Sequence, residues 1–243
     1  METLDSLQSR RAMLKSALVL AGGMGLSACV SKAADVAAAP FIPVPQQPVI
    51  PLEKPQMAAI QEPAFSRGRI HTPDGVRPQL FRRAIAALDK HSMRIQAHDK
   101  IAIVDFSIPS SLPRFHIINL GTGACETLLV AHGIGSDPEH TGILQRFSNE
   151  MNSNATCEGA FLATDYYTGK HGPSQRLEGL DESNSNALDR AIVVHAAAYA
   201  TPEHIAKWGK LGRSQGCFAV GAADLEKVFL KVGAGRMIYA TKS

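Results

Sequence analysis

The residues with the clearest chemical potential lie near the C-terminus, in the segment Gly209–Val220. Cys217 lies within it, and three glycines before the cysteine allow the backbone to turn sharply or to let another molecule come close. The apolar run Phe218-Ala219-Val220 predicts a buried, rigid element behind the sulfur. A thiol held in this way suits nucleophilic attack, whereas a cysteine without such neighbours is as often a small buried apolar residue.

A histidine upstream offers a base for this thiol. The apolar, β-branched run Ala191–Val194 ends at His195, as when a buried strand brings a side chain to the mouth of a site. An imidazole beside a thiol takes its proton and stabilises the thiolate. Because distance along the chain does not give distance in space, Cys217 and His195 are at this point a candidate pair.

His195 followed by Ser214-x-Gly216-Cys217 resembles the signature of the YkuD-type L,D-transpeptidases, peptidoglycan enzymes in which a histidine precedes an S-x-G-C nucleophile motif. The resemblance runs from about residue 101 to the end and is to the murein L,D-transpeptidase catalytic-domain branch. Its segments are Tyr167–Gly172, Arg176–Leu180, Asn186-Ala187 and Gly209–Cys217. Two positions depart from the family pattern: Gln215 stands where many relatives have His or Trp, and Phe218 where Pro or Ile/Val-Arg is usual. These departures affect substrate fit more than the nucleophile.

The resemblance implies that Cys217 attacks the carbonyl between the third residue of a tetrapeptide stem, usually diaminopimelate, and the terminal D-alanine. His195 would act first as base and then as acid, and an amine of another stem would resolve the thioester into a 3–3 cross-link. Water as acceptor would make the protein an L,D-carboxypeptidase instead. The departures at Gln215 and Phe218 leave a third alternative from another class, a non-catalytic wall-binding lipoprotein. Peptidoglycan stem peptides are the expected partner, and no cofactor is expected.

Further residues are candidates for shaping the site or binding substrate. The residues that flank the nucleophile are expected to shape the site, with backbone N–H groups at its turn receiving the oxyanion; they are Arg213, Ser214, Gln215 and Gly216. His132 ends an apolar strand as His195 does, so it is either a second site residue or a hydrogen-bonded histidine at a strand end. His171 lies with Gly172 in a polar loop and, together with Arg176, could receive a stem carboxylate, since guanidinium binds carboxylates through two hydrogen bonds. Arg176 could equally form a structural ion pair.

Metal and disulfide chemistry have weaker support. The chain has nine histidines and four cysteines, but no C-x-x-C, H-E-x-x-H or H-x-H spacing, so no metal site is expected. Cys125 and Cys157 either pair as a disulfide in an oxidising compartment or stay as thiols, because pairing depends on a Cα separation that the sequence does not give.

Residues 1–28 predict an export signal. Arg10-Arg11 precede the apolar run Ser16–Leu26, which is shorter than the roughly 20 residues that span a bilayer. The twin arginines resemble the twin-arginine export motif, so both that route and the general secretory route stay open. The run ends in Leu26-Ser27-Ala28-Cys29, which matches the bacterial lipobox, so we expect Cys29 to be acylated; the alternative is an ordinary signal with a chance cysteine.

The predicted location follows from these features. The protein should be exported, lie on the periplasmic side of the cell envelope and be anchored through Cys29, with Val30 favouring the outer over the inner membrane because it is not the aspartate of inner-membrane retention. Residues 29–63 are rich in Ala and Pro and predict a disordered, semi-rigid tether. Loss of the signal leaves 22 basic and 20 acidic side chains, and no basic run is interleaved with aromatic residues. Nucleic acid is therefore not an expected partner.

The remaining residues, 64–243, suffice for one catalytic domain. We expect a mainly β (α+β) fold, a β-sandwich of the L,D-transpeptidase type with a few peripheral helices. The expected helices are Pro78–Leu88, Thr201–Lys207 and Ala222–Val232, and the expected strands are Ile101–Phe106, Arg114–Leu120, Thr127–Ala131, Gly159–Ala163, Ala191–His195 and Met237–Ala240.

Overall fold

The computed structural model describes residues 71–242; the predicted signal (1–28), Cys29 and the tether (29–63) lie outside them. The helices are α1 (Pro78–Lys90), α2 (Pro202–Trp208) and α3 (Ala222–Lys231), with 3-10 turns η1 (Ile134–Ser136) and η2 (Glu182–Asn184). The strands are β1 (Lys100–Asp105), β2 (Phe115–Asn119), β3 (Cys125–Leu128), β4 (Gly159–Gly169), β5 (Gly172–Gly179), β6 (Val193–Ala196), β7 (Phe218–Val220) and β8 (Met237–Thr241). Within residues 71–242, no helix has the length and apolar character needed to cross a membrane.

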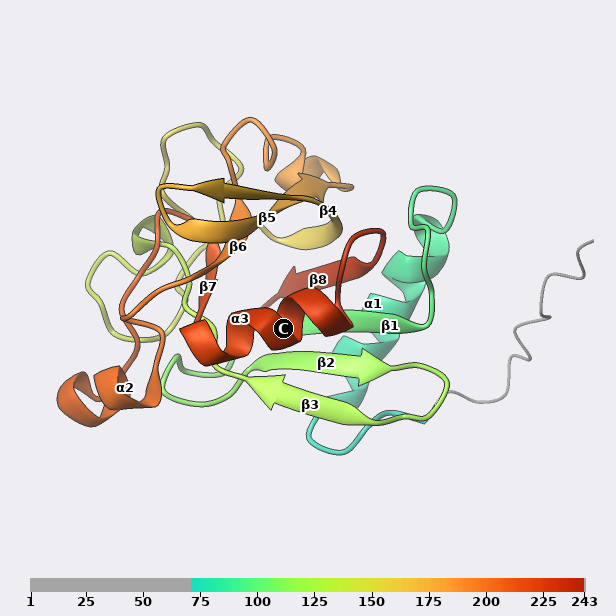
Figure 1. Cartoon of the computed structure of the whole chain (residues 1–243), viewed down its shortest axis with the longest axis horizontal. Helices are drawn as coiled ribbons and strands as arrows, with labels where there is room; N and C mark the ends of the chain where they lie inside the picture. The colour runs from blue at the N-terminus through green and yellow to red at the C-terminus, as the bar shows by residue number, and fades with distance from the viewer. Residues whose placement is uncertain (1–70, 243) are drawn as a thin grey trace, which may run out of the picture. The chain divides into compact units, whose positions relative to one another are not determined.

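The strands form one eight-stranded sheet in the order β3-β2-β1-β8-β4-β5-β6-β7 (Figure 1). β1 pairs with β8, and β6 with β7, in parallel, while the other neighbours are antiparallel. The chain that leaves β3 also meets β7 at the other edge, where the Ala131 N–H donates to the Ala219 carbonyl over 2.8 Å. The two edges of the sheet therefore come together beside the C-terminal segment that carries Cys217.

Two apolar clusters pack on the two faces of this sheet. Successive side chains of a strand point to opposite faces, so β1 sends Ala102 and Val104 into the larger cluster and Ile101 and Ile103 into the other. The larger cluster also contains Phe161 of β4 and Phe218 of β7, whose ring centroids lie 5.4 Å apart. The predicted fold class, mainly β with a few peripheral helices, is confirmed. All eight strands belong to one sheet.

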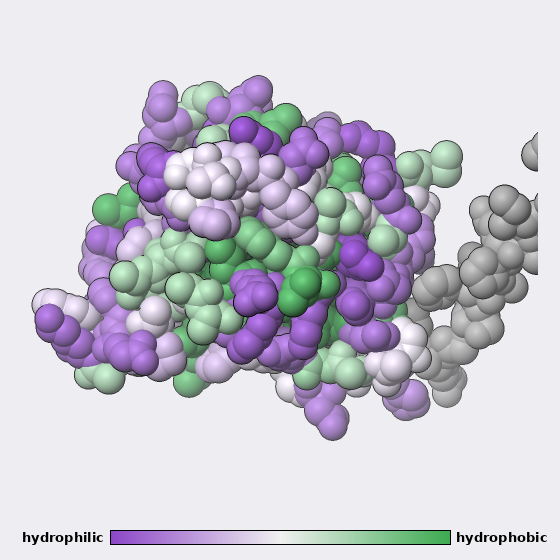
Figure 2. Space-filling view, in the orientation of Figure 1, coloured by the Kyte–Doolittle hydropathy of each residue, from purple (hydrophilic) through white to green (hydrophobic). Residues whose placement is uncertain are grey.

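The helices cover the sheet as amphipathic elements do. α1 begins at Pro78, whose fixed φ suits a first helical position, and buries the i, i+3/i+4 set Leu80, Phe81, Ala84 and Leu88 in the smaller cluster. α3 contributes Leu225 and Val228 to the larger cluster. Figure 2 shows apolar surface between α3 and the β4–β5 hairpin above it, where Tyr166 packs edge-on against Phe229.

The structure contains two strands that the sequence did not predict. Residues 172–179 form β5 and Phe218–Val220 form β7; β4 extends to Gly169, so β4 and β5 make a long hairpin. The possible disulfide between Cys125 and Cys157 is not formed: both are free thiols, and they belong to clusters on opposite faces of the sheet.

Candidate active site

A tight turn carries Cys217 into β7. Gly216 has φ +116°, and a Cβ at this position would lie 2.7 Å from the Ala155 carbonyl oxygen, so only glycine fits. The Ser214 hydroxyl closes the turn, because it accepts from the Gly216 N–H (3.1 Å) and donates to the Cys217 carbonyl (2.7 Å). Ser214 thus fixes the backbone on both sides of Gly216.

The chain around Gly133 supports this turn through its backbone. The Ser214 N–H donates to the His132 carbonyl over 2.9 Å, and the Ile134 N–H donates to the Ser214 carbonyl over 2.8 Å. A Cβ on Gly133 would lie 2.7 Å from both the nitrogen and the Cα of Gly216. The two segments therefore touch backbone to backbone, and neither can move without the other.

Strand register brings His195 and the thiol to the same face. β6 and β7 run parallel, with Val194 beside Phe218 and His195 beside Ala219. Val194 and Phe218 both point into the larger apolar cluster, so His195 and Ala219 point to the opposite face. Cys217 is two residues before Ala219, in the bend that leads into β7, so the same alternation continued to Cys217 puts it on the face of His195.

His195 is held as a neutral imidazole with one free nitrogen. His195 is only 2% exposed, and its Nδ1 is 2.9 Å from the Ala196 carbonyl oxygen. A carbonyl only accepts, so the proton is on Nδ1 and Nε2 is the basic nitrogen. The His171 ring stacks on it, with centroids 4.3 Å apart and planes 21° apart. Burial lowers the pKa of His195, against the opposing influence of its hydrogen bond to Ala196 and with smaller lowering influences from His171 and Lys170.

Cys217 is held as a thiol. Its Sγ donates to the Ala191 carbonyl over 3.5 Å. Burial raises the pKa of Cys217, against the opposing influence of the Val193 N–H and the cations Lys170 and Arg190. A thiol in this environment needs a base to become a nucleophile, and the neutral imidazole of His195 is the candidate for that base.

The other residues predicted to shape the turn are distributed around it. Gln215 is exposed at the tip of the turn. Arg213 is half-buried and donates to the carbonyls of Asp137 and Pro138, so it ties the turn to the chain after η1.

His132 lies in the interior. It is 1% exposed, and its Nδ1 is 2.7 Å from Arg114 Nη2 while its Nε2 is 3.3 Å from Asp137 Oδ2. Burial and the Arg114 cation lower the pKa of His132 to about 4. It is a hydrogen-bonded histidine, as the second alternative has it, but it lies four residues beyond the end of β3; its carbonyl accepts from the Ser214 N–H.

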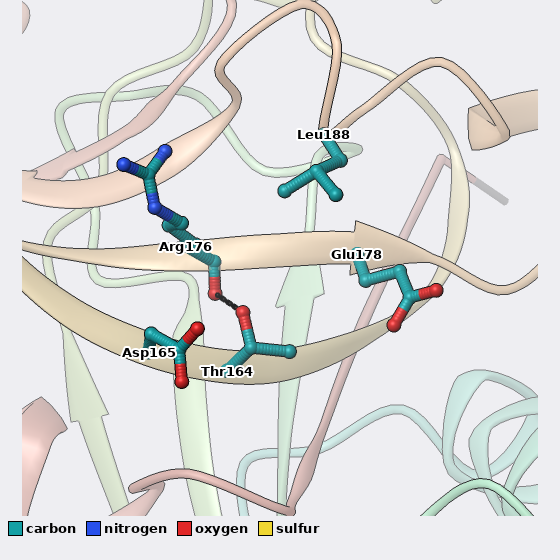
Figure 3. A pocket seen from close by; sticks show the side chains of 5 residues that line it. All are labelled: Thr164, Asp165, Arg176, Glu178 and Leu188. Atoms are coloured by element: carbon teal, nitrogen blue, oxygen red, sulfur yellow. Dashed lines mark hydrogen bonds between the residues drawn. The ribbon is translucent and has the colours of Figure 1, made fainter. Parts of the chain in front are cut away.

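His171 and Arg176 both belong to the β4–β5 hairpin. His171 is exposed in the hairpin turn, over His195. The Arg176 guanidinium stacks 4.2 Å above the Tyr167 ring, and within residues 71–242 it has no ion pair. It lines a pocket of about 420 Å³ (Figure 3).

Sequence reasoning missed Arg190, the residue directly before the run that leads to His195. Its guanidinium donates to the Ser148 and Ala155 carbonyls and to Cys157 Sγ. A Cβ at position 216 would collide with the same Ala155 carbonyl, so Arg190 fixes the backbone that packs against the turn before Cys217.

The described residues contain no group of three or more His, Cys, Asp or Glu that could hold a metal ion.

Residues 73–241 match the family model of the L,D-transpeptidase catalytic domain. A search of curated proteins finds no match. Similar solved structures include L,D-transpeptidase 3 from Mycobacterium tuberculosis in complex with a faropenem-derived adduct, at 13% identity over 59% of this chain and 60% of that chain with a TM-score of 0.38. Another is an L,D-transpeptidase from Stackebrandtia nassauensis, at 15% identity over 60% of this chain and 57% of that chain with a TM-score of 0.36.

The alignments span about three fifths of the length of these structures. The family match covers far more than half of the present chain and contains every residue of the turn, of β6 and of the hairpin described above. The chain belongs to the L,D-transpeptidase catalytic-domain family.

Proposed function

We propose that the protein is a peptidoglycan L,D-transpeptidase in which Cys217 is the nucleophile and His195 the base. The observation that carries the proposal is the parallel pairing of β6 with β7, which puts the thiol and the free Nε2 on one face of the sheet. The departures from the family pattern, Gln215 and Phe218, do not disturb this pair: Gln215 is exposed, and Phe218 points into the core.

The first half of the reaction forms a thioester. His195 Nε2 takes the Cys217 proton, and the thiolate attacks the carbonyl that joins the third stem residue to the terminal D-alanine. The Ser214 hydroxyl already occupies the Gly216 N–H, which leaves the Cys217 N–H to stabilise the oxyanion. The C–N bond then breaks, and D-alanine leaves with the proton that His195 returns to its amine.

The second half releases the enzyme. An amine from another stem attacks the thioester, His195 takes its proton, and the C–S bond breaks to give a 3–3 cross-link; His195 returns the proton to the Cys217 sulfur, which restores the thiol. Water in place of the amine would give a tripeptide, which is the carboxypeptidase outcome. Incubation with tetrapeptide muropeptides, followed by separation of the products, distinguishes cross-linked dimers from tripeptides, and a preparation that forms neither contradicts the enzymatic proposal.

The identity of the nucleophile has a direct test. A carbapenem should add its mass to the wild-type protein and to Cys125→Ser, the matched control, but not to Cys217→Ala. An adduct that persists in Cys217→Ala would refute the assignment of the nucleophile. A wall-binding protein without catalysis predicts a different result: all three proteins bind sacculi equally, and none turns over tetrapeptide.

We further propose that the protein is exported and anchored in the envelope by acylation of Cys29, with residues 29–63 as the tether. The support is the order of sequence features: twin arginines, a short apolar run, the lipobox and a Pro-rich segment. Wild type should fractionate with membranes and Cys29→Ala with the soluble periplasm. Equal recovery of both in the soluble fraction would overturn the anchor and leave the catalytic proposal intact.

A further inference from the structure

The pocket on the β4–β5 hairpin carries a mixed set of charges. Its lining residues are Thr164, Asp165, Arg176, Glu178 and Leu188. Arg176 and Glu178 project from β5, Asp165 comes from β4, and Leu188 approaches from the loop before β6 (Figure 3). Asp165 lies at the register shift between Ala163 and Tyr166. One cation, two carboxylates and one apolar side chain therefore surround a space of about 420 Å³.

The charged side chains of this pocket form no ion pairs with one another. The Arg176 guanidinium rests on Tyr167 and makes no ion pair within the described chain. Asp165 is exposed, and in the same part of the chain it also has no ion-pair partner. Glu178 is bound to Arg94 on its outer side, with 2.7 Å between the charged atoms. A ligand that carries both a carboxylate and an ammonium group would complement this arrangement.

The pocket lies on the same face as the candidate nucleophile. Arg176 pairs with Val193 across β5 and β6, and the next residue of β6, Val194, lies beside Phe218 of β7. Arg176 is thus about 10 Å, two strand spacings, from the strand that follows Cys217. The loop that carries Leu188 continues to Ala191, whose carbonyl accepts from the thiol.

We infer that this pocket is a subsite for the side chain of the third stem residue and binds its zwitterionic end. The Arg176 guanidinium receives the side-chain carboxylate, Asp165 and Glu178 receive the ammonium group, and the alkyl part of the side chain lies against Leu188. The inference rests on the proposed function for the identity of the peptide. A diamino-dicarboxylic acid at the third position fills the pocket, whereas a lysine supplies the ammonium group and leaves Arg176 without a carboxylate.

Peptide binding to the Cys217→Ala protein tests the subsite without turnover. Two tetrapeptides that differ only at the third residue, diaminopimelate or lysine, are titrated by calorimetry. We expect the diaminopimelate peptide to bind at least about tenfold more tightly, as for a charge-assisted pair. Arg176→Gln should abolish this preference by weakening only the diaminopimelate peptide, and Arg176→Lys should retain part of it. Arg82→Gln, an exposed arginine of α1, is the control and should keep the full preference.

The outcomes separate the subsite from the proposed function. Equal binding of the two peptides, or an equal loss for both in Arg176→Gln, overturns the subsite. Asp165→Asn gives a second test at an exposed position, because it should weaken both peptides through their shared ammonium group; unchanged binding of both contradicts the assignment. With Cys217 present, the wild type and the control Arg82→Gln should both be acylated by a carbapenem, at the same rate. Failure of the wild type to be acylated would count against the proposed function, while the peptide preference would stand or fall by calorimetry.

Discussion

Replacing Gly133 by alanine should displace the nucleophile without touching it. Gly133 has an ordinary φ of −74°, so the substitution adds no backbone strain of its own. The new Cβ would lie 2.3 Å from the Asn154 carbonyl oxygen and 2.7 Å from the Gly216 nitrogen. An unstrained C···O contact is about 3.3 Å, so one backbone segment must move by about 1 Å. Both obstacles are backbone, and no side-chain rotation relieves them.

This displacement has a calculable effect. Overpacking of this kind costs about 1–3 kcal/mol of the free energy of unfolding, and a reacting group moved by about 1 Å loses on the order of 10²-fold in rate. The assay is the second-order rate constant for carbapenem acylation of Cys217, measured by mass spectrometry, beside the free energy of unfolding in urea.

Gly121→Ala is the matched control, since its Cβ would meet only the Asn119 side chain, at 3.4 Å. We expect wild-type acylation and little change in stability for this control. A folded Gly133→Ala protein that acylates as fast as wild type would refute the claim that the Gly133 segment sets the position of the turn.

Three further predictions concern the histidines. Because burial lowers the pKa of His195, the acid limb of the pH profile for acylation should lie below the usual imidazole range; a limb above that range would contradict the assignment. His171→Ala exposes His195 and removes an electrostatic interaction that lowers its pKa, so it should move this limb to higher pH, and an unmoved limb would show that the stacked ring does not tune the base. Burial lowers the pKa of His132 from 6.5 to about 4. Between these two pH values the unfolded chain is protonated at His132 and the native state is not. Stability should therefore fall on acidification, with a His132 share of about 2 kcal/mol between pH 7 and pH 4.5; urea unfolding of His132→Gln should lack that share, and an unchanged pH dependence would contradict the native pKa.

Local pattern predicted six of the eight strands and left out β5 and the three-residue β7. Residues 191–195 and 101–106 are β-branched and apolar, and β6 and β1 lie there. Residues 172–179 contain Pro173, two glycines and four polar side chains, a composition that argues against a central strand. They are nevertheless paired on both sides, by β4 and β6. The hairpin partner and the neighbouring strand determine β5, and neither is visible in a local window.

The sequence points to the residues of the candidate site but not to their arrangement. The S-x-G-C motif and the run ending in histidine make Cys217 and His195 candidates, yet only the parallel register of β6 and β7 relates their positions in space. His132 has the same sequence context as His195, an apolar run that ends in histidine. The difference between them is Arg114, which comes from the start of another strand and binds the His132 ring in the core. Such partners depend on the tertiary structure, so the sequence left both interpretations of His132 open.

The buried charges around His132 have a positional role. Arg114 is fully buried and donates to the Val130 and Ile108 carbonyls as well as to His132 Nδ1. Since a guanidinium only donates, Nδ1 accepts, and the His132 proton is on Nε2, facing the Asp137 carboxylate. Burial raises the pKa of Asp137, but hydrogen bonds from Thr141 and Gly142 outweigh it, so the pKa is lowered and the carboxylate is ionised.

Burying such a chain of charges adds little stability compared with apolar side chains of the same volume, while removing one partner is costly. Its effect here is geometric: it fixes the backbone from Val130 through His132, and the His132 carbonyl receives the Ser214 N–H. From Ser214 the hydroxyl reaches across Gly216 to the Cys217 carbonyl. The position of the thiol is therefore set by polar contacts that begin in the core, and a mutation at Arg114 should misplace the nucleophile although it never approaches the substrate.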